Sequence, residues 1–246
     1  MTPPWVTVPA FSGRTFKMRL NVAAGAEYSE MATGTYDREA LHLLVRTPQS
    51  SMVVWDVGAH TGYASLMLAS DLCVREVHAF EPHPGNAARL RENVAENGSP
   101  VTVHEVALSD ENGLAEMQIF PDIDALQGTG GYLAGIYPPL DRQCYSGFVD
   151  HSVFVRKGDS LVGSENADKS FAAPVPDIVK IDVEGAELKV LEGLFETLHR
   201  RLPITLLEVH STELQASCEW LLRSWGYRVQ SIRILGGGRA HLLATA

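Results

Sequence analysis

Acidic side chains follow almost every strand-like segment of this 246-residue chain. The polar residues that close these apolar runs are Asp56, Glu81, Ser109 with Asp110, Asp182 with Glu184, and Glu208 with His210. In doubly wound sheets, ligands bind in the crevice beyond the carboxyl ends of the strands. Carboxylates at that position can accept hydroxyl or ammonium donors and can act as general bases. The sequence therefore predicts a ligand site at one edge of a sheet, with acids as its main polar groups.

A glycine-containing turn follows the first apolar run. The pattern Asp56-x-Gly58-x-x-x-Gly62 suits a tight strand-to-helix turn that lets the backbone approach a ligand closely. It is not the G-x-G-x-x-G of dinucleotide sites, and Asp56 would repel a phosphate while favouring an ammonium or sulfonium. Glu81 lies 19 residues after Gly62, at a second strand end, where a carboxylate can accept both hydroxyls of a ribose. These features predict a site for a nucleoside that carries positive charge.

The segments that must position these residues alternate between strands and helices. We predict strands over residues 53–57, 77–80, 101–108, 177–182 and 204–209, with helical patterns between most of them. This alternation is typical of an α/β fold with a parallel sheet and helices on both faces. Residues 227–233 and 239–244, joined by three glycines, are predicted to form a hairpin, so the sheet should end in antiparallel strands.

Two regions lie outside this alternation. Residues 1–50 are predicted to form an N-terminal extension, with a β-hairpin over 5–22 and a helix over 36–45, and residues 51–246 to form the ligand-binding domain. Residues 120–153 are rich in glycine and proline, and a loop of this length is more typical of a lid or substrate loop than of a neutral connection. Tyr132 and Tyr137 in this loop can pack against a ring or sugar face, although a purely structural role stays open for each.

The composition excludes several classes of protein. With 45% hydrophobic residues, the chain can build a core, so wholesale disorder is excluded. The formal net charge of 20 − 30 = −10 argues against a nucleic-acid scaffold. Three separated cysteines without a C-x-x-C pair favour a reducing compartment. Neither a leader pattern nor a membrane-spanning apolar run is found in the sequence, and we expect a cytoplasmic protein.

Five segments of the chain resemble the FkbM family of class I S-adenosylmethionine-dependent methyltransferases. They are residues 54–63, 79–83, 106–110, 179–187 and 207–210, among which Lys-Ile-Asp-Val-Glu-Gly is the most family-specific string. The resemblance implies a Rossmann-like fold with a mostly parallel seven-stranded sheet, an antiparallel C-terminal hairpin, and S-adenosylmethionine as cofactor. It also implies methyl transfer to a hydroxyl of a small natural product or sugar, leaving S-adenosylhomocysteine.

The resemblance also implies which residues contact the cofactor. Glu81 would hold the ribose hydroxyls, and Asp182 would face the methionine end. His60 stands where family members commonly carry Asn, and its imidazole can still donate a hydrogen bond. The complete set of expected cofactor-binding residues is Asp56, Gly58, His60, Gly62, Tyr63, Glu81, Pro82, Ala107, Leu108, Ser109 and Asp182.

A hydroxyl acceptor gains from a base that accepts its proton. His210 is the first candidate, because an imidazole titrates near neutral pH; Asp182, Glu208 and Glu184 are alternatives, and a structural role for His210 stays open. Glu184 is also expected to contact the substrate. Asp182, Glu208 and His210 can converge on a divalent metal, but their spacing does not demand one, and no metal is predicted.

Other functions remain as alternatives. The same residues would serve an enzyme that transfers the methyl group to a nitrogen of a small molecule. They would also serve a protein of the same fold that binds the nucleoside without catalysis. A nicotinamide-dependent oxidoreductase is disfavoured by the missing G-x-G-x-x-G and by the antiparallel end of the sheet. As partner we expect a small hydroxylated acceptor rather than nucleic acid or a membrane, and association into a homodimer stays open.

Overall fold

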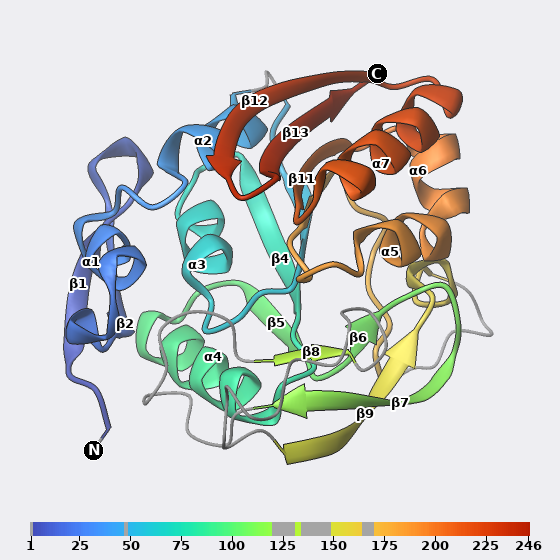
Figure 1. Cartoon of the computed structure of the whole chain (residues 1–246). Coiled ribbons are helices and arrows are strands. Elements are labelled where there is room, and N and C mark those ends of the chain that lie inside the picture. Colours follow the sequence, from blue (N-terminus) through green and yellow to red (C-terminus); the bar gives the residue numbers. More distant parts are fainter. Residues whose placement is uncertain (1, 47–48, 120–130, 134–148, 164–169) are drawn as a thin grey trace.

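The computed structural model describes residues 2–46, 49–119, 131–133, 149–163 and 170–246. Its centre is a seven-stranded sheet of spatial order β12-β13-β11-β10-β3-β4-β5 (Figure 1). The strands are β3 (Met52–Val57), β4 (Val74–Phe80), β5 (Val101–His104), β10 (Ile178–Ile181), β11 (Ile204–Val209), β12 (Arg228–Gly236) and β13 (Arg239–Thr245). All neighbours pair in parallel except β13, which is antiparallel to both β11 and β12. The predicted seven-stranded sheet and its C-terminal hairpin are confirmed.

The central strands are hydrophobic on both faces because helices cover both sides of the sheet. Every residue of β3 is buried, as expected for a valine-rich strand in a parallel sheet. Trp55 of β3 packs against Phe80 of β4, with ring centroids 4.9 Å apart. These contacts fix the carboxyl ends of β3 and β4 beside each other, and residues predicted to bind the ligand follow those ends.

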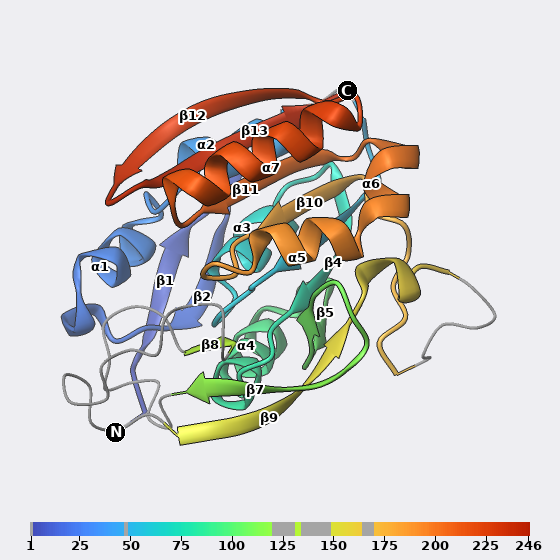
Figure 2. The same cartoon turned by 45° about the vertical axis from the view of Figure 1, so that its right-hand side comes forward.

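Five helices follow the strands of the central sheet, with α3 and α4 toward one face and α5 to α7 toward the other (Figure 2). They are α3 (Tyr63–Ala69), α4 (Pro84–Asn97), α5 (Glu187–Gly193), α6 (Phe195–Arg201) and α7 (Thr212–Ser224). Gly98 ends α4 in the left-handed conformation. The Ser211 hydroxyl accepts a hydrogen bond from the Leu214 amide at 3.1 Å and caps α7. The helical segment between β10 and β11 is divided into α5 and α6 at Leu194.

The N-terminal segment packs onto the same core as the sheet. Its elements are β1 (Trp5–Pro9), β2 (Thr15–Arg19), α1 (Ala26–Thr33), α2 (Arg38–Val45) and the short 3-10 turns Phe11–Gly13 and Val22–Ala24. The predicted hairpin is confirmed, whereas α1 is an additional helix. Phe16 and Leu44 share one hydrophobic cluster with Met52 and Leu66. The hairpin and both helices therefore form one wall beside α3.

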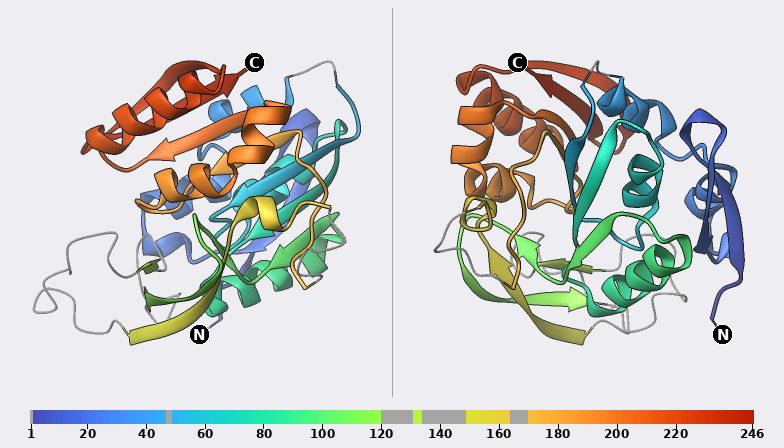
Figure 3. Two further views of the ribbon diagram at one scale, coloured as in Figure 1. Left: turned by 90° about the vertical axis from the view of Figure 1, so that its right-hand side faces the viewer. Right: turned by 180° about the vertical axis from the view of Figure 1, so that it is seen from behind.

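A second sheet lies across the lower side of the molecule in Figure 1 and is seen from two further sides in Figure 3. Its order is β6-β9-β7-β8, with bounds β6 (Ala107–Leu108), β7 (Gly113–Ile119), β8 (Gly131–Leu133) and β9 (Val149–Arg156). A 3-10 turn, Gly158–Ser160, follows β9. None of the helices in the described part of the chain is both long and apolar enough to cross a bilayer.

The second sheet corrects two sequence-based expectations. The predicted strand over 101–108 is two strands in different sheets, because the chain turns where the Val106 amide bonds back to the His104 carbonyl. The predicted loop over 120–153 is wrong at its C-terminal end, where β9 pairs with β7 and buries Val153 and Val155. Residues 120–130 and 134–148 lie outside the described residues.

Candidate functional site

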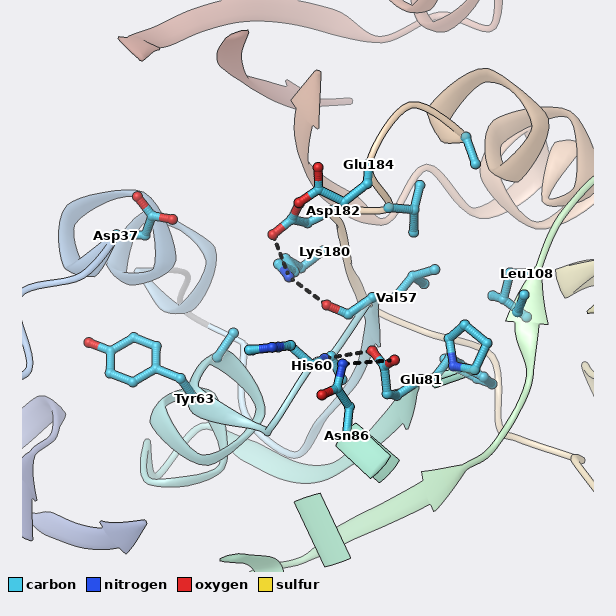
Figure 4. Close-up of a pocket in the computed structure, with 18 of the residues that line it drawn as sticks. Asp37, Val57, His60, Tyr63, Glu81, Asn86, Leu108, Lys180, Asp182 and Glu184 are labelled. Carbon is cyan, nitrogen blue, oxygen red and sulfur yellow. Dashed lines mark hydrogen bonds and ion pairs between the residues drawn. The ribbon is translucent and has the colours of Figure 1, made fainter. Parts of the chain in front are cut away.

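A pocket opens at the carboxyl ends of β3, β4 and β10 (Figure 4). Its walls come from the turn after β3, the segment after β4, strands β6 and β7, the turn after β10, and the N-terminal helices. The predicted site residues that line it are Gly58, His60, Tyr63, Glu81, Pro82, Ala107, Leu108, Asp182 and Glu184. The fold thus brings most of the predicted cofactor-binding residues around one hollow.

The other predicted residues lie beneath or behind this lining. Asp56 is fully buried under the turn, and Gly62 packs against Leu90 at the start of α3. The Ser109 hydroxyl is bonded to Asp110 at 3.0 Å. Glu208 and His210 are not among the lining residues; the His210 Nε2 lies 3.8 Å from an oxygen of Asp182 and 3.6 Å from an oxygen of Glu208. The backbone of Tyr132 belongs to β8, its side chain lies outside the description, and Tyr137 lies outside the described residues.

Glu81 is a buried carboxylate held by backbone donors. One oxygen accepts the His60 amide at 2.8 Å, and the other accepts the His83 amide at 2.9 Å. The oxygen that accepts the His83 amide also accepts the Asn86 side-chain amide in a longer bond of 3.4 Å, and the oxygen that accepts the His60 amide keeps a lone pair for a further donor. Burial raises the pKa of Glu81 to about 7, although these hydrogen bonds oppose the rise. The geometry suits a pair of ligand hydroxyl groups, which would approach from the pocket side.

The turn after β3 needs glycine at position 58. Gly58 has φ of 77°, and a Cβ there would overlap the carbonyl oxygen of Asp182. His60 also has positive φ, 51°, and its amide is tied to Glu81. Burial lowers the pKa of the His60 imidazole to about 4, so this ring is neutral at pH 7. The turn is therefore a backbone cradle with a neutral side chain facing the pocket.

Lys180 lines the pocket and was not predicted from the sequence as a site residue. Its ammonium lies 3.3 Å from an oxygen of Asp182 (Figure 4), 3.3 Å from an oxygen of Asp56 and 3.3 Å from the Gly58 carbonyl oxygen. Burial acts to lower the pKa of Lys180, but Asp56 and Asp182 outweigh burial, and the pKa is raised. A lysine within the apolar run Ile-Val-Lys-Ile of β10 was the available signal, because a buried lysine requires a charged partner.

His210 lies among carboxylates rather than at the pocket surface. Its Nδ1 is 2.7 Å from Glu187, and its Nε2 is 3.4 Å from Glu184, 3.6 Å from Glu208 and 3.8 Å from Asp182. Burial acts to lower the pKa of His210, but the Glu187 hydrogen bond and the nearby acids raise it to about 9. When these carboxylates are its only neighbours, the His210 ring is therefore protonated at pH 7. A protonated imidazole cannot accept a second proton, so in this state His210 cannot act as a base.

The acidic wall of the pocket contains two carboxyl groups with opposite behaviour. Burial acts to raise the pKa of Asp182, but Lys180 and His210 outweigh it, and the pKa is lowered. Burial raises the pKa of Glu184 to about 7. Glu184 also has positive φ, 52°, in the tight turn that leads to α5. The wall thus offers an ionised acid beside one that titrates near neutrality.

The opposite wall comes from the N-terminal helices. Tyr28 and Met31 of α1 and Tyr36 before α2 line the pocket. The Tyr36 ring meets the Tyr63 ring edge-on, with centroids 5.7 Å apart. The Tyr63 hydroxyl is buried without a hydrogen-bond partner among the described residues. This aromatic wall was not predicted, because sequence spacing does not show which side of the sheet an N-terminal extension covers.

Known proteins share this arrangement of sequence segments. The sequence model of the Methyltransferase FkbM domain matches residues 56–229. A hexuronic acid methyltransferase, AglP of Haloferax volcanii, is 27% identical over 177 residues, which cover 71% of this chain and 63% of AglP. The 31-O-demethyl-FK506 methyltransferase FkbM of Streptomyces tacrolimicus is 30% identical over 196 residues, which cover 72% of this chain and 73% of that protein.

Solved structures show the same fold. Methyltransferase FkbM from Methylobacillus flagellatus KT superimposes with a TM-score of 0.53 at 16% identity, over 89% of this chain and 52% of that chain. Precorrin 8W decarboxylase of Methanobacterium thermoautotrophicum gives a TM-score of 0.52 at 18% identity, over 93% and 96% of the two chains. The matched domain covers most of this chain, from Asp56 to beyond the carboxylates around His210, and the chain belongs to the FkbM methyltransferase family.

Proposed function

We propose that this chain is an S-adenosylmethionine-dependent O-methyltransferase that acts on a hydroxyl of a small natural product or sugar. The observation that carries the proposal is a single pocket in which Glu81 and the pair Asp182 and Glu184 face the same space (Figure 4). One end can hold a nucleoside, and the other presents acids to an acceptor.

The lining fits the cofactor. Glu81 can accept the two ribose hydroxyls, and the glycine at position 58 leaves room for a close backbone approach. Ala107, Leu108 and Met117 give an apolar wall that suits a flat base. When bound, S-adenosylmethionine supplies a methyl group on a positively charged sulfur, and the acidic wall at Asp182 favours that charge.

The acceptor end fits a hydroxylated molecule. Tyr28 and Tyr36 can pack against a ring or sugar face, and Asp182 and Glu184 can accept hydrogen bonds from its hydroxyl groups. The names of the two relatives support this class, since one acts on a hexuronic acid and the other on an O-demethyl compound. Holding the acceptor oxygen in line with the methyl group would supply much of the acceleration.

Glu184 is the proposed proton acceptor. It lines the pocket, whereas His210 stands behind it with its Nε2 3.4 Å from the Glu184 carboxylate. Glu184→Gln should lower kcat by about 100-fold or more, which is the usual range for loss of a general base, with little change in cofactor affinity. Glu192→Gln, on the exposed side of α5, is the matched control and should keep full activity. A Glu184→Gln enzyme with unchanged kcat would remove Glu184 from the reaction.

The proposed reaction is tested by mass spectrometry. The protein is incubated with S-adenosylmethionine carrying a deuterated methyl group and with sugars, uronic acids, polyols and amines in separate reactions. Transfer of the labelled methyl to a hydroxylated acceptor supports the proposal. Transfer only to amines would replace it with N-methylation. Binding of the cofactor without transfer to any member of a broad panel would favour a non-catalytic role.

A further inference from the structure

A group of four carboxylates surrounds His210 at the carboxyl ends of β10 and β11. We call Asp182, Glu184, Glu187, Glu208 and His210 the carboxylate-histidine cluster. The His210 side chain is only 4% exposed. Its Nε2 has no hydrogen-bond partner within the described ranges. A buried ring nitrogen without such a partner needs a physical explanation, since most buried polar atoms are hydrogen-bonded.

The other ring nitrogen fixes the orientation of His210. Nδ1 lies 2.7 Å from an oxygen of Glu187, a carboxylate that is fully buried. If Nδ1 carries the proton of a neutral ring, Nε2 presents its lone pair toward the centre of the cluster. A carboxylate that holds one histidine nitrogen in this way is the usual support of a histidine that binds a metal with its other nitrogen.

The two flanking carboxylates are oriented in the same manner. Asp182 uses one oxygen for Lys180 at 3.3 Å, and its other oxygen lies 3.8 Å from the His210 Nε2. Glu208 uses one oxygen for His241 Nε2 at 3.0 Å, and its other oxygen lies 3.6 Å from the His210 Nε2. Asp182, Glu208 and His210 are thus each held in place by a contact to one atom. The second oxygen or nitrogen of each side chain faces the space between the three.

The side chains around this space do not supply enough hydrogen-bond donors for the carboxylate oxygens that face it. A protonated His210 can donate one N–H from Nε2, and three carboxylate oxygens face that atom at 3.4 to 3.8 Å. Arg239 reaches Glu208 at 3.7 Å, but its side chain is 43% exposed. Buried acids are stable only when paired with charge or bound to a metal. The ligand atoms of Asp182, Glu208 and His210 all lie within 4.8 Å of one another, which is compact enough for one ion after small side-chain adjustments.

A neighbouring group also contains a histidine nitrogen, His241 Nδ1, that is buried without a hydrogen-bond partner among the described residues, but the other nitrogen, which faces the acids, is already bonded. Asp37, Glu208 and His241 also lie within reach of one ion. There, however, His241 is bonded to Glu208, and Asp37 is paired with Arg233 at 2.7 Å. The Arg233 contact holds Asp37, and the His241 bond orients Glu208 toward His210.

We propose that Asp182, Glu208 and His210 bind a divalent first-row transition-metal cation such as Mn²⁺ or Zn²⁺. One imidazole with two carboxylates suits these ions better than Ca²⁺, which prefers oxygen ligands alone. Asp182 and Glu184 also line the pocket, so the ion would lie next to the acceptor. The functional consequence rests on the proposed O-methyl transfer, in which a cation would bind and polarise the acceptor hydroxyl. The binding itself is measured without an acceptor.

The test is a metal titration of the full chain after chelator treatment and removal of the chelator. It is run at pH 8, where protons compete less with the metal than at pH 7. Free Mn²⁺ is followed by its electron paramagnetic resonance signal, and Zn²⁺ is then added as competitor. Saturable binding of one Mn²⁺ per chain, displaced by Zn²⁺, is expected for the unmodified protein.

Variants distinguish the proposed site from other acids. His210→Ala and the isosteric Glu208→Gln should abolish measurable Mn²⁺ binding. Glu187→Gln should weaken it by about 10- to 100-fold, the usual effect of removing a partner that orients a ligand. His199→Asn, on the exposed side of α6, is the matched control and should bind as the unmodified protein does. Circular dichroism identifies any variant that does not fold. The folded variants then decide whether these residues bind the metal.

Two outcomes overturn the cation site. One is the absence of saturable Mn²⁺ and Zn²⁺ binding, and the other is equal binding by the unmodified protein and folded His210→Ala or Glu208→Gln. Cofactor affinity is measured on the same samples. Intact S-adenosylmethionine binding without metal binding would refute the cation site and leave the proposed function standing. Metal binding without cofactor binding would refute the proposed function and leave the cation site standing.

Discussion

Replacement of Glu81 by glutamine should weaken binding of S-adenosylhomocysteine by roughly 100-fold at pH 8. A hydrogen bond to a charged acceptor contributes about 1.5 to 3 kcal/mol, and two ribose hydroxyls would use this carboxylate. In the variant, the new NH₂ group must face an amide donor, because the His60 and His83 amides approach the two oxygens at 2.8 and 2.9 Å. A loss of about 3 kcal/mol corresponds to the stated factor.

The same residue should make cofactor affinity depend on pH. Burial raises the pKa of Glu81 to about 7, so the carboxyl is largely protonated at pH 6 and ionised at pH 8. A protonated carboxyl accepts fewer hydrogen bonds, and affinity should therefore rise from pH 6 to pH 8. Without ligand the sign is opposite: the native state retains a proton that the unfolded state loses, so this group's contribution to stability falls as pH rises from about 4.5 to 7.

The assay is isothermal titration calorimetry with S-adenosylhomocysteine at pH 6, 7 and 8. Unmodified protein is compared with Glu81→Gln and with Glu105→Gln, an exposed acid beyond the end of β5. Glu184 titrates in all three proteins, so the difference between them isolates Glu81. A Glu81→Gln affinity within about twofold of the unmodified protein at pH 8 would refute the assignment of Glu81 to the ribose.

Further predictions concern the support of the pocket and are checked by thermal and urea unfolding. Gly58→Ala should lower the free energy of unfolding by more than about 2 kcal/mol, because its Cβ would overlap the Asp182 carbonyl and φ is positive. Gly98→Ala, also at positive φ but with open space around it, should cost only about 1 kcal/mol; equal losses would show that the contact with Asp182 is unimportant. Lys180→Met should cost about 3 to 5 kcal/mol by leaving buried Asp56 unpaired, and adding Asp56→Asn should recover part of it. No loss in Lys180→Met would contradict the ion pair.

The central sheet and the end of the pocket around Glu81 were predictable because their signals are local. Apolar runs of four to six residues ended at acids and glycines, and parallel strands place such ends at one edge. Glu81 was predicted from its distance to the glycine turn, and the structure places it facing that turn. The C-terminal hairpin followed from its three glycines.

The remaining features depend on contacts between distant segments. Strand β7 is recognisable only through its pairing with the distant strand β9, in which Ile119 pairs with Val149 and Gly113 with Val155. Helix α1 carries a weak apolar pattern, and its place in the pocket wall comes from its packing against β1. The surroundings of His210 were also hidden, because Glu187 and His241 come from elements whose approach is set by the fold. His210 was predicted from the sequence as a candidate base, whereas in the structure it lies in a buried cluster of acids.

We propose above all that the pocket between Glu81 and Asp182 binds S-adenosylmethionine. The most direct measurement is parallel calorimetric titration of the unmodified chain with S-adenosylmethionine, S-adenosylhomocysteine and NAD. We predict saturable binding of the first two at one molecule per chain and no heat of binding for NAD. Binding of NAD in place of both, or binding of none of the three, would contradict it.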